Sequence, residues 1–268
     1  MRAAEDHLRA IRDELDAEHA LAPPIHAKRV IELKDVWLTF DRPVLRGVTL
    51  DVREGETLMI AGESGSGKST ILKLILRLLV PDSGEIVVLG ERVADLTFPE
   101  ALDLRRRIGM VFQNAALFDS LTVFDNVAYP LRENTDYDEQ EIERIVRERL
   151  DFVDLDPDIV MGQVPSQLSG GMRKRVGIAR AIATDPRIIL YDEPTAGLDP
   201  LTVGRINDLI RKLQRELNVT SVLVTHDIRA GFRVANRVAL LREGRIIFEG
   251  TPERMVAADD PYIKSFMS

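Results

Sequence analysis

Apolar and polar residues alternate along two stretches near the start of the chain, 30–40 and 44–52. Alternation with a period of two is typical of half-buried antiparallel strands. A third apolar run, 56–62, ends in a glycine-rich turn, and an apolar helix is expected to follow from Lys68 to about Leu79. Further short apolar runs predict strands at 85–89, 108–112, 187–191, 221–225, 238–242 and 245–249.

Helical patterns lie between many of these predicted strands, which indicates a largely parallel sheet with helical crossovers. The exception is a stretch at about 114–170, which has the pattern of helices and turns, with an acidic helix near 137–153. We therefore predict an α/β fold that combines a mainly parallel sheet, an antiparallel β subdomain and an all-helical insert.

The first 27 residues are expected to form an extension ahead of the main domain, 28–268, whose C-terminal tail starts at about 251. Leu8, Ile11 and Leu15 recur at helical spacing among charged residues, and Pro23 and Pro24 end that pattern. This segment has no apolar core typical of a signal peptide, and no stretch is apolar enough to span a membrane. The chain is therefore expected to be cytosolic, with any membrane role exerted through a partner.

Composition narrows the function classes. The 268 residues carry 36 Lys and Arg against 44 Asp and Glu, a net charge of −8, and no cysteine. An acidic chain is a poor binder of nucleic acid by bulk charge, and without cysteine it has neither a thiolate zinc site nor a thiol nucleophile. The basic triplets 105–107 and 173–175 are interpreted as solvated helix faces.

The segment 62–69 fits the pattern G-x-x-x-x-G-K-[ST] between a predicted strand and a predicted helix, the context that confirms a phosphate-binding loop. Its backbone N–H groups and the following helix N-terminus favour phosphate oxygens. Lys68 is expected to reach the β- and γ-phosphates of a nucleoside triphosphate, and the Ser69 hydroxyl to ligate Mg²⁺. The predicted loop residues are Gly62, Glu63, Ser64, Gly65, Ser66, Gly67, Lys68 and Ser69.

An acidic pair, Asp192 and Glu193, ends the apolar run RIILYDEP. Asp192 is expected to hold Mg²⁺ through its water shell. Glu193 is expected to polarise the attacking water as general base, which favours hydrolysis over phosphoryl transfer to another substrate.

The stretch Leu168-Ser169-Gly170-Gly171-Met172 opens a second predicted helix with an anion-binding N-terminus. Its place at the tip of the helical insert is remote from the phosphate loop of the same chain. A head-to-tail homodimer, in which each such segment faces the ATP of the other subunit, is the economical arrangement.

With these motifs in this order, the chain closely resembles the ATP-binding cassette (ABC) ATPases of membrane transporters over about 30–250. The resemblance implies a P-loop NTPase with a RecA-like core and an all-helical ABC subdomain, and it adds Thr70 to the nucleotide contacts. Phe40 matches the aromatic residue that stacks on adenine, and Gln113 matches the glutamine that senses Mg²⁺ and the attacking water. Asp199 matches the residue that couples the two sites across the dimer, and His226 matches the histidine at the γ-phosphate. Met172 is a departure, because most of the family has glutamine there.

Within this family, the string QNAALFDSLTVFDNVAYPLREN, residues 113–134, is similar to the ATPases of Mla/Mce-type lipid transporters. That resemblance implies an MlaE-like permease dimer, an MCE-domain lipid-binding protein and glycerophospholipid cargo. It also implies peripheral association with the cytoplasmic face of the inner membrane. The final DDPYIKSFMS resembles a tail that reaches the second subunit or a STAS-domain regulator.

Two alternatives stay open. The first is the ATPase of a polar-solute transporter such as an amino-acid importer, because those proteins share DNV in the insert. The second is an ABC ATPase that acts on DNA or ribosomes, but such members carry long coiled coils, zinc modules or two cassettes in one chain. A GTPase is disfavoured, because no N-K-x-D-type motif is present.

Overall fold

The computed structural model describes residues 27–267, so the helix expected in the first 20 residues lies outside the described part. The chain separates into two compact units, one of residues 27–97 and 220–267 and one of residues 98–219. This division does not test the predicted boundaries of the extension, the helical subdomain and the tail, which therefore stay predictions.

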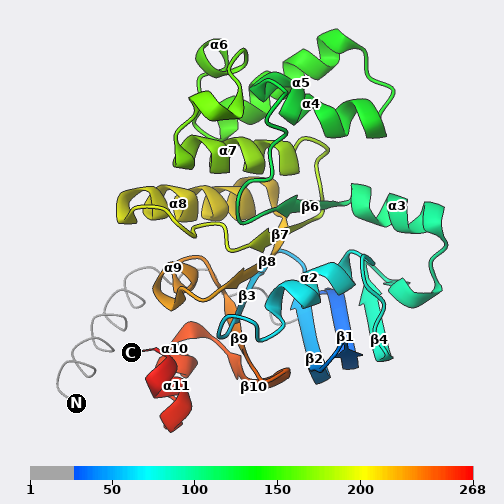
Figure 1. Ribbon diagram of the computed structural model, residues 1–268, viewed down its shortest axis with the longest axis vertical. Helices are drawn as coiled ribbons and strands as arrows, with labels where there is room; N and C mark the ends of the chain where they lie inside the picture. The colour runs from blue at the N-terminus through cyan, green and yellow to red at the C-terminus, as the bar shows by residue number, and fades with distance from the viewer. Residues whose placement is uncertain (1–26, 268) are drawn as a thin grey trace. The chain divides into compact units, whose positions relative to one another are not determined.

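The first unit contains an antiparallel sheet in the order β2-β1-β4-β5, in which β2 and β5 are the edge strands. Figure 1 shows β1, β2 and β4 side by side in blue and cyan. The strands are β1 (Arg29–Thr39), β2 (Pro43–Arg53), β4 (Ser83–Val88) and β5 (Glu91–Arg92). The alternating pattern of the sequence therefore marks a sheet with one buried face, as predicted.

The same unit contains the strand series β10-β9-β3-β8. β3 pairs in parallel with both β8 and β9, and β10 pairs antiparallel with β9. These strands are β3 (Thr57–Ala61), β8 (Thr220–Thr225), β9 (Arg237–Arg242) and β10 (Arg245–Gly250). Every residue of β3 and β8 is buried, which explains why the apolar residues in the middle of each strand are consecutive and not alternating.

Short helices complete the first unit: α2 (Lys68–Ile75), η1 (Val93–Asp95), α9 (Ile228–Phe232), α10 (Pro252–Val256) and α11 (Pro261–Phe266). Ile263 and Met267 at the end of the chain are buried in the cluster that contains Met59 of β3 and Phe232 of α9. The C-terminal tail thus packs on the core of its own unit.

The expected extent of the helix after the phosphate loop is wrong at its end. Helix α2 stops at Ile75, and Arg77 takes a left-handed conformation with φ of 50°. The N–H of Leu78 donates to the carbonyl of Lys73 at 2.8 Å and closes the turn. The apolar run continues past the helix, so periodicity alone did not mark its end.

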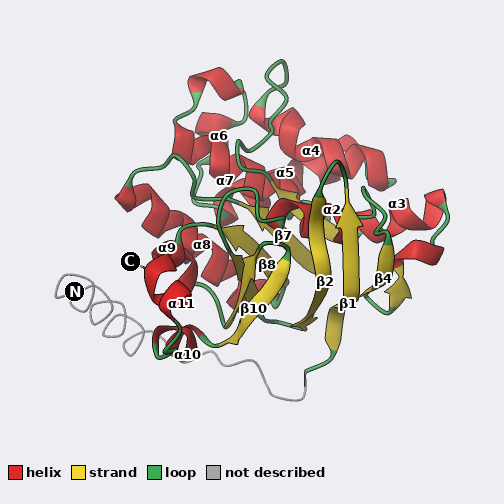
Figure 2. Cartoon of the chain, turned by 60° about the horizontal axis from the view of Figure 1, so that its bottom comes forward, coloured by secondary structure: helices red, strands yellow, loops and turns green. Residues whose placement is uncertain are grey.

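The second unit is mainly helical, as the red ribbons of α4, α5 and α7 show in Figure 2. Its two parallel strands are β6 (Ile108–Val111) and β7 (Ile188–Asp192). Its helices are α3 (Phe98–Arg106), α4 (Val123–Asn134), α5 (Glu139–Phe152), α6 (Pro157–Val160), η2 (Pro165–Gln167), α7 (Gly170–Ala181) and α8 (Pro200–Leu217). Helices α4, α5 and α7 pack on one another, which confirms the expected run of helices and turns between β6 and α7.

Candidate functional site

The phosphate loop joins the buried strand β3 to helix α2 in the first unit, as predicted. Gly62 passes so close to β9 that a Cβ on it would lie 2.3 Å from the carbonyl oxygen of Leu241. Only glycine fits there, so the loop can turn directly against the sheet. Gly67 caps α2, whose first residues are Lys68, Ser69 and Thr70. The N–H groups at a helix start point toward its N-terminus, which here is the loop.

Two side chains make this loop suited to an anion. Lys68 is only 7% exposed, and its Nζ donates to the carbonyl oxygens of Gly62 at 2.8 Å and Glu63 at 2.9 Å. Ser66 Oγ is buried and has no hydrogen-bond partner among the described residues. A buried hydroxyl without a partner is costly, so its presence in the same loop as the Lys68 ammonium points to a ligand with acceptor oxygens.

Strand register places His226 at the same edge as the loop. Ala61 of β3 pairs with Thr225 of β8 in a parallel ladder, so Gly62 and His226 both follow neighbouring strand ends. The carboxyl ends of parallel strands are where ligands bind in such sheets.

Phe40 lies on the turn between β1 and β2, where its N–H donates to the carbonyl of Arg42 at 3.2 Å. This turn leads to Val44, whose Cγ1 is 3.3 Å from the position that a Cβ on Gly67 would take. The Phe40 ring is 57% exposed and therefore open to stack on a planar group.

A contact that the sequence did not reveal ties the phosphate loop to the C-terminal helix. Tyr262 Oη of α11 donates to Glu63 Oε1 at 2.8 Å. The guanidinium carbon of Arg242 lies 3.7 Å from the centroid of the Tyr262 ring. Burial and the neighbouring Glu63 carboxylate raise the pKa of Tyr262, so its hydroxyl stays protonated and able to donate.

In the second unit, strand register brings Gln113 near the acidic pair. Val111 of β6 pairs with Tyr191 of β7 in parallel, so Gln113 and the pair Asp192 and Glu193 follow neighbouring strand ends. Glu193 takes a left-handed backbone conformation with φ of 49°. A residue other than glycine keeps this conformation only when the surrounding structure holds it.

The predicted anion-binding segment starts α7 in the same unit. Ser169 is the N-cap, and its hydroxyl accepts from the N–H of Met172 at 3.2 Å. A Cβ on Gly171 would lie 2.7 Å from Thr202 Cγ2, so glycine allows α8 to approach. Asp199 caps α8 by accepting from the N–H of Thr202 at 3.0 Å, and its bonds to Thr202 lower the pKa of the carboxyl.

A cavity of about 350 Å³ in this unit gathers three predicted segments: the loop after β6, the start of α7 and the loop before α8. Its walls include Gln113, Gly170, Lys174 and Leu198. Lys174 corrects the interpretation of 173–175 as a solvated face, because it is only 6% exposed. Burial lowers its pKa, and the Glu193 carboxylate opposes that shift. Lys174 shares a helix face with the buried Ile178, a signal that the sequence did contain.

Each side chain predicted to bind magnesium has an oxygen that suits this ion when phosphates are also bound. No group of three or more acidic or histidine side chains gathers for metal binding in the described part of the chain. Mg²⁺ needs few protein ligands when phosphates and water supply the others. The Ser69 hydroxyl and the Asp192 carboxylate are oxygen donors of the kind that Mg²⁺ prefers.

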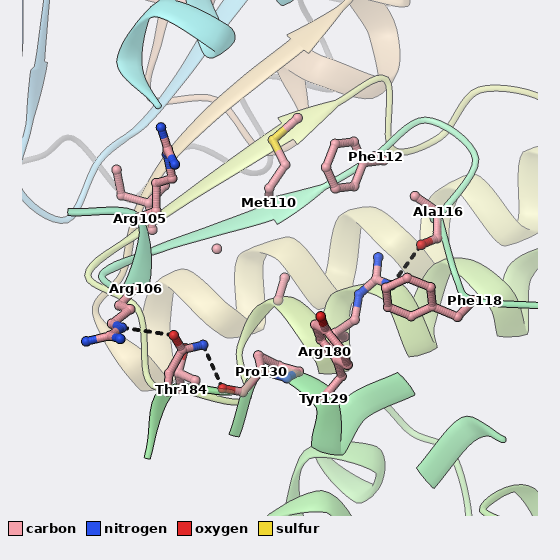
Figure 3. Close-up of a pocket in the computed structure, with 14 residues that line it drawn as sticks. Arg105, Arg106, Met110, Phe112, Ala116, Phe118, Tyr129, Pro130, Arg180 and Thr184 are labelled. Carbon is pink, nitrogen blue, oxygen red and sulfur yellow. Dashed lines mark hydrogen bonds between the residues drawn. The ribbon is translucent and has the colours of Figure 1, made fainter. Parts of the chain in front are cut away.

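A second hollow of the same unit, about 310 Å³, lies among α3, β6, α4 and α7 (Figure 3). Phe112, Phe118 and Tyr129 are each more than two-fifths exposed around it. Arg180 Nη1 donates to the carbonyl of Ala116 at 2.8 Å, and its guanidinium lies 5.9 Å from the centroid of the Phe118 ring. Clustered exposed aromatic side chains with an arginine are typical of a protein-binding surface.

Each unit thus carries part of the predicted machinery. The first holds the phosphate loop, Phe40 and His226, and the second holds Gln113, Asp192, Glu193, Asp199 and the segment from Ser169 to Gly171. None of the helices in the described residues is both long and apolar enough to cross a membrane.

Comparison with known proteins gives a consistent result. Residues 45–196 match the family described as ABC transporter. The chain is 40% identical over 243 residues to the intermembrane phospholipid transport system ATP-binding protein MlaF of Haemophilus influenzae, covering 90% of each chain. It is 43% identical over 229 residues to the methionine import ATP-binding protein MetN of Caulobacter vibrioides, covering 84% of this chain and 68% of that one. Among solved structures, a dimeric ATP-binding cassette bound to ADP and Pi matches with a TM-score of 0.76 and 37% identity, covering 83% of this chain and 98% of that one.

Proposed function

The chain belongs to the ABC transporter family of ATP-binding proteins, and from that premise we propose that it powers a permease that moves phospholipids between membranes. It is an ATPase with the cassette fold, and it binds ATP. The observation that carries the lipid assignment is the match to MlaF over nearly the whole length of both chains.

ATP would be held by the phosphate loop. Lys68 would turn from the carbonyls of Gly62 and Glu63 to the β- and γ-phosphates, because an ammonium binds an anionic oxygen more strongly than a carbonyl. Ser66 Oγ would donate to a phosphate oxygen and so gain the partner it lacks. Phe40 would stack on the adenine ring, and Thr70 would extend the contacts along α2.

Hydrolysis would use Glu193 as general base toward the attacking water, with His226 at the γ-phosphate and Gln113 at the water. Ser69, Asp192 and Gln113 would hold Mg²⁺, which when bound supplies charge neutralisation at the β- and γ-oxygens. These roles are supported by the strand ends from which the residues project.

The second anion-binding segment would act across a homodimer. Ser169, Gly170 and Gly171 would cap the γ-phosphate held by the other subunit, and Asp199 would couple the two sites. The likeness to a dimeric cassette bound to ADP and Pi supports this arrangement. ATP would then hold the dimer together, and hydrolysis would release it.

The hollow around Phe112, Phe118 and Tyr129 would receive a cytoplasmic segment of an MlaE-like permease dimer. This contact would place the chain peripherally on the cytoplasmic face of the inner membrane. We also propose an MCE-domain lipid-binding protein as a further partner and a STAS-domain protein as a regulator. The acidic composition supports no role for nucleic acid.

Purification of the whole complex from membranes, followed by mass spectrometry of bound lipid, tests this proposal. We expect glycerophospholipid in the complex and ATPase activity that depends on Glu193. A complex that contains an amino-acid-binding partner and responds to amino acid, with no lipid, would favour the polar-solute alternative that the MetN likeness represents.

A further inference from the structure

Lys174 occupies a position that a lysine rarely takes. It lies one turn into α7 and is 6% exposed. Removal of an ammonium group from water is strongly unfavourable unless hydrogen bonds replace the lost hydration. The partners of this ammonium therefore indicate why it is there.

Those partners are two backbone carbonyls from the proposed reaction centre. Lys174 Nζ donates a short hydrogen bond to the carbonyl oxygen of Gln113. It also lies 3.4 Å from the carbonyl oxygen of Glu193. One side chain thus joins the loop after β6, the loop after β7 and the helix that Ser169 starts.

The hydrogen bond from Lys174 to Glu193 matters because of the backbone conformation of Glu193. With φ of 49°, Glu193 is in a left-handed region that is unfavourable for a residue other than glycine. Its carbonyl accepts from the N–H of Ala196 at 3.2 Å as well as from Lys174, so two donors hold that peptide group. The same bonds therefore fix the backbone from which the Glu193 side chain extends, and with it the direction of the Cα–Cβ bond.

We propose that Lys174 is a positioning residue, which aligns Gln113 and Glu193 through their carbonyls and links both to the start of α7. This inference rests on the proposed roles of Gln113 and Glu193 in hydrolysis. In this role Lys174 would act through the backbone of these two residues and not through contact with ATP or the attacking water. Its loss would misplace the general base and the glutamine while the phosphate loop stays intact.

Arg175, the next residue, provides a matched control on the same helix. It also directs a cation at backbone carbonyls, with Nη1 2.6 Å from the oxygen of Asp154 and 3.5 Å from that of Val153. Those two carbonyls directly follow the end of α5 and are not part of the proposed reaction centre. Arg175→Met therefore removes the same kind of contact without disturbing Gln113 or Glu193.

The test compares steady-state ATPase kinetics of the full chain for the wild type, Lys174→Met, Lys174→Gln and Arg175→Met. Methionine keeps the length of the lysine but has no donor, so we expect kcat to fall roughly tenfold while KM for ATP stays within about twofold. Glutamine donates from an amide, so Lys174→Gln should recover most of the lost kcat. Arg175→Met should keep the wild-type kcat.

Thermal melting of each variant separates positioning from folding. If Arg175→Met and Lys174→Met lose similar stability but only the latter loses kcat, the positioning role stands. An unchanged kcat in Lys174→Met overturns it, and so does a fall that glutamine does not relieve. Glu193→Gln in the same assay tests the proposed function separately: if that variant turns over like the wild type, the assignment of the general base fails and not only the role of Lys174.

Discussion

In the proposed function, nucleotide binding depends most on Lys68. This residue is 7% exposed and its ammonium donates to the carbonyls of Gly62 and Glu63, so its positive charge is already placed in the loop. We expect Lys68→Ala to weaken ATP binding about tenfold or more in a calorimetric titration, because a charge-assisted bond to phosphate is lost. Lys73, exposed on the same helix, is the control: Lys73→Ala should bind ATP like the wild type.

Glu63 and Tyr262 form a pair whose effect can be isolated. Glu63 brings a negative charge into the loop that we propose binds phosphates, and Tyr262 donates to that carboxylate at 2.8 Å. We expect Tyr262→Phe to raise the dissociation constant for ATP about twofold to fivefold, because the carboxylate loses a donor that offsets its charge. The measurement is a titration of nucleotide binding.

A double-mutant cycle decides whether the two residues act on each other. In a Glu63→Ala background, Tyr262→Phe should leave ATP affinity unchanged. An equal loss of affinity in both backgrounds would show that Tyr262 acts through packing of α11 and not through Glu63.

Among the elements, α4 has a well-defined start. Thr122 is its N-cap: the N–H of Asp125 donates to Thr122 Oγ1 at 3.1 Å, and Oγ1 donates to Asp125 Oδ2 at 2.6 Å. Thr122→Ala should lower the free energy of unfolding by about 1 kcal/mol, as measured by chemical denaturation. Thr122→Ser keeps the cap, so its loss should be smaller; equal losses would contradict the capping role.

The Asp125 carboxylate makes this helix start sensitive to acid. The bond from Thr122 and the bond from Arg132 at 3.0 Å lower its pKa below the usual value of 3.8. A carboxyl with a lowered folded-state pKa stabilises the fold above its unfolded pKa and loses that contribution as the pH falls. Asp125→Asn should therefore be less stable than the wild type at pH 7, and the difference should shrink below about pH 4. If the difference in stability between the two proteins does not change with pH, the ionised Asp125 carboxylate does not stabilise the start of α4.

At the scale of the whole molecule, the proposed mechanism links hydrolysis at Glu193 to assembly of the dimer. Glu193→Gln should bind ATP but nearly stop hydrolysis, because an amide does not accept the proton of the attacking water. ATP should then hold a stable dimer that size-exclusion chromatography detects. Lys68→Ala with ATP should stay at the elution volume of the nucleotide-free protein.

A mixture of two inactive variants tests whether the sites are shared between subunits. The proposed dimer has two ATP sites, each formed by Lys68 of one subunit and Ser169 of the other. In a heterodimer of Lys68→Ala and Ser169→Arg, one site carries both changes and the other keeps an intact Lys68 and an intact Ser169. We expect part of the activity to return, measured by single-turnover as well as steady-state hydrolysis. No recovery, despite heterodimers confirmed by native mass spectrometry, would count against the head-to-tail arrangement.

Local features of the sequence determined most of the fold and the chemical character of the protein. Strands such as β3 and β8 follow from continuous apolar runs, and β1 from alternation, because backbone geometry imposes its period on nearby residues. The phosphate loop is recognised for the same reason: its glycines, Lys68 and Ser69 are consecutive, so one short segment contains the whole motif.

Only the tertiary structure decided which distant residues meet. Lys174 is 61 positions from Gln113, and Tyr262 is 199 positions from Glu63. The sequence places Lys174 on the same helix face as the apolar Ile178, but only the folded structure shows that this lysine is buried and bonded to the loop after β6. The end of α2 was missed for a related reason, because a left-handed Arg77 stops the helix inside an apolar run. Periodicity depends on neighbours along the chain, whereas burial and hydrogen bonding depend on neighbours that folding brings together.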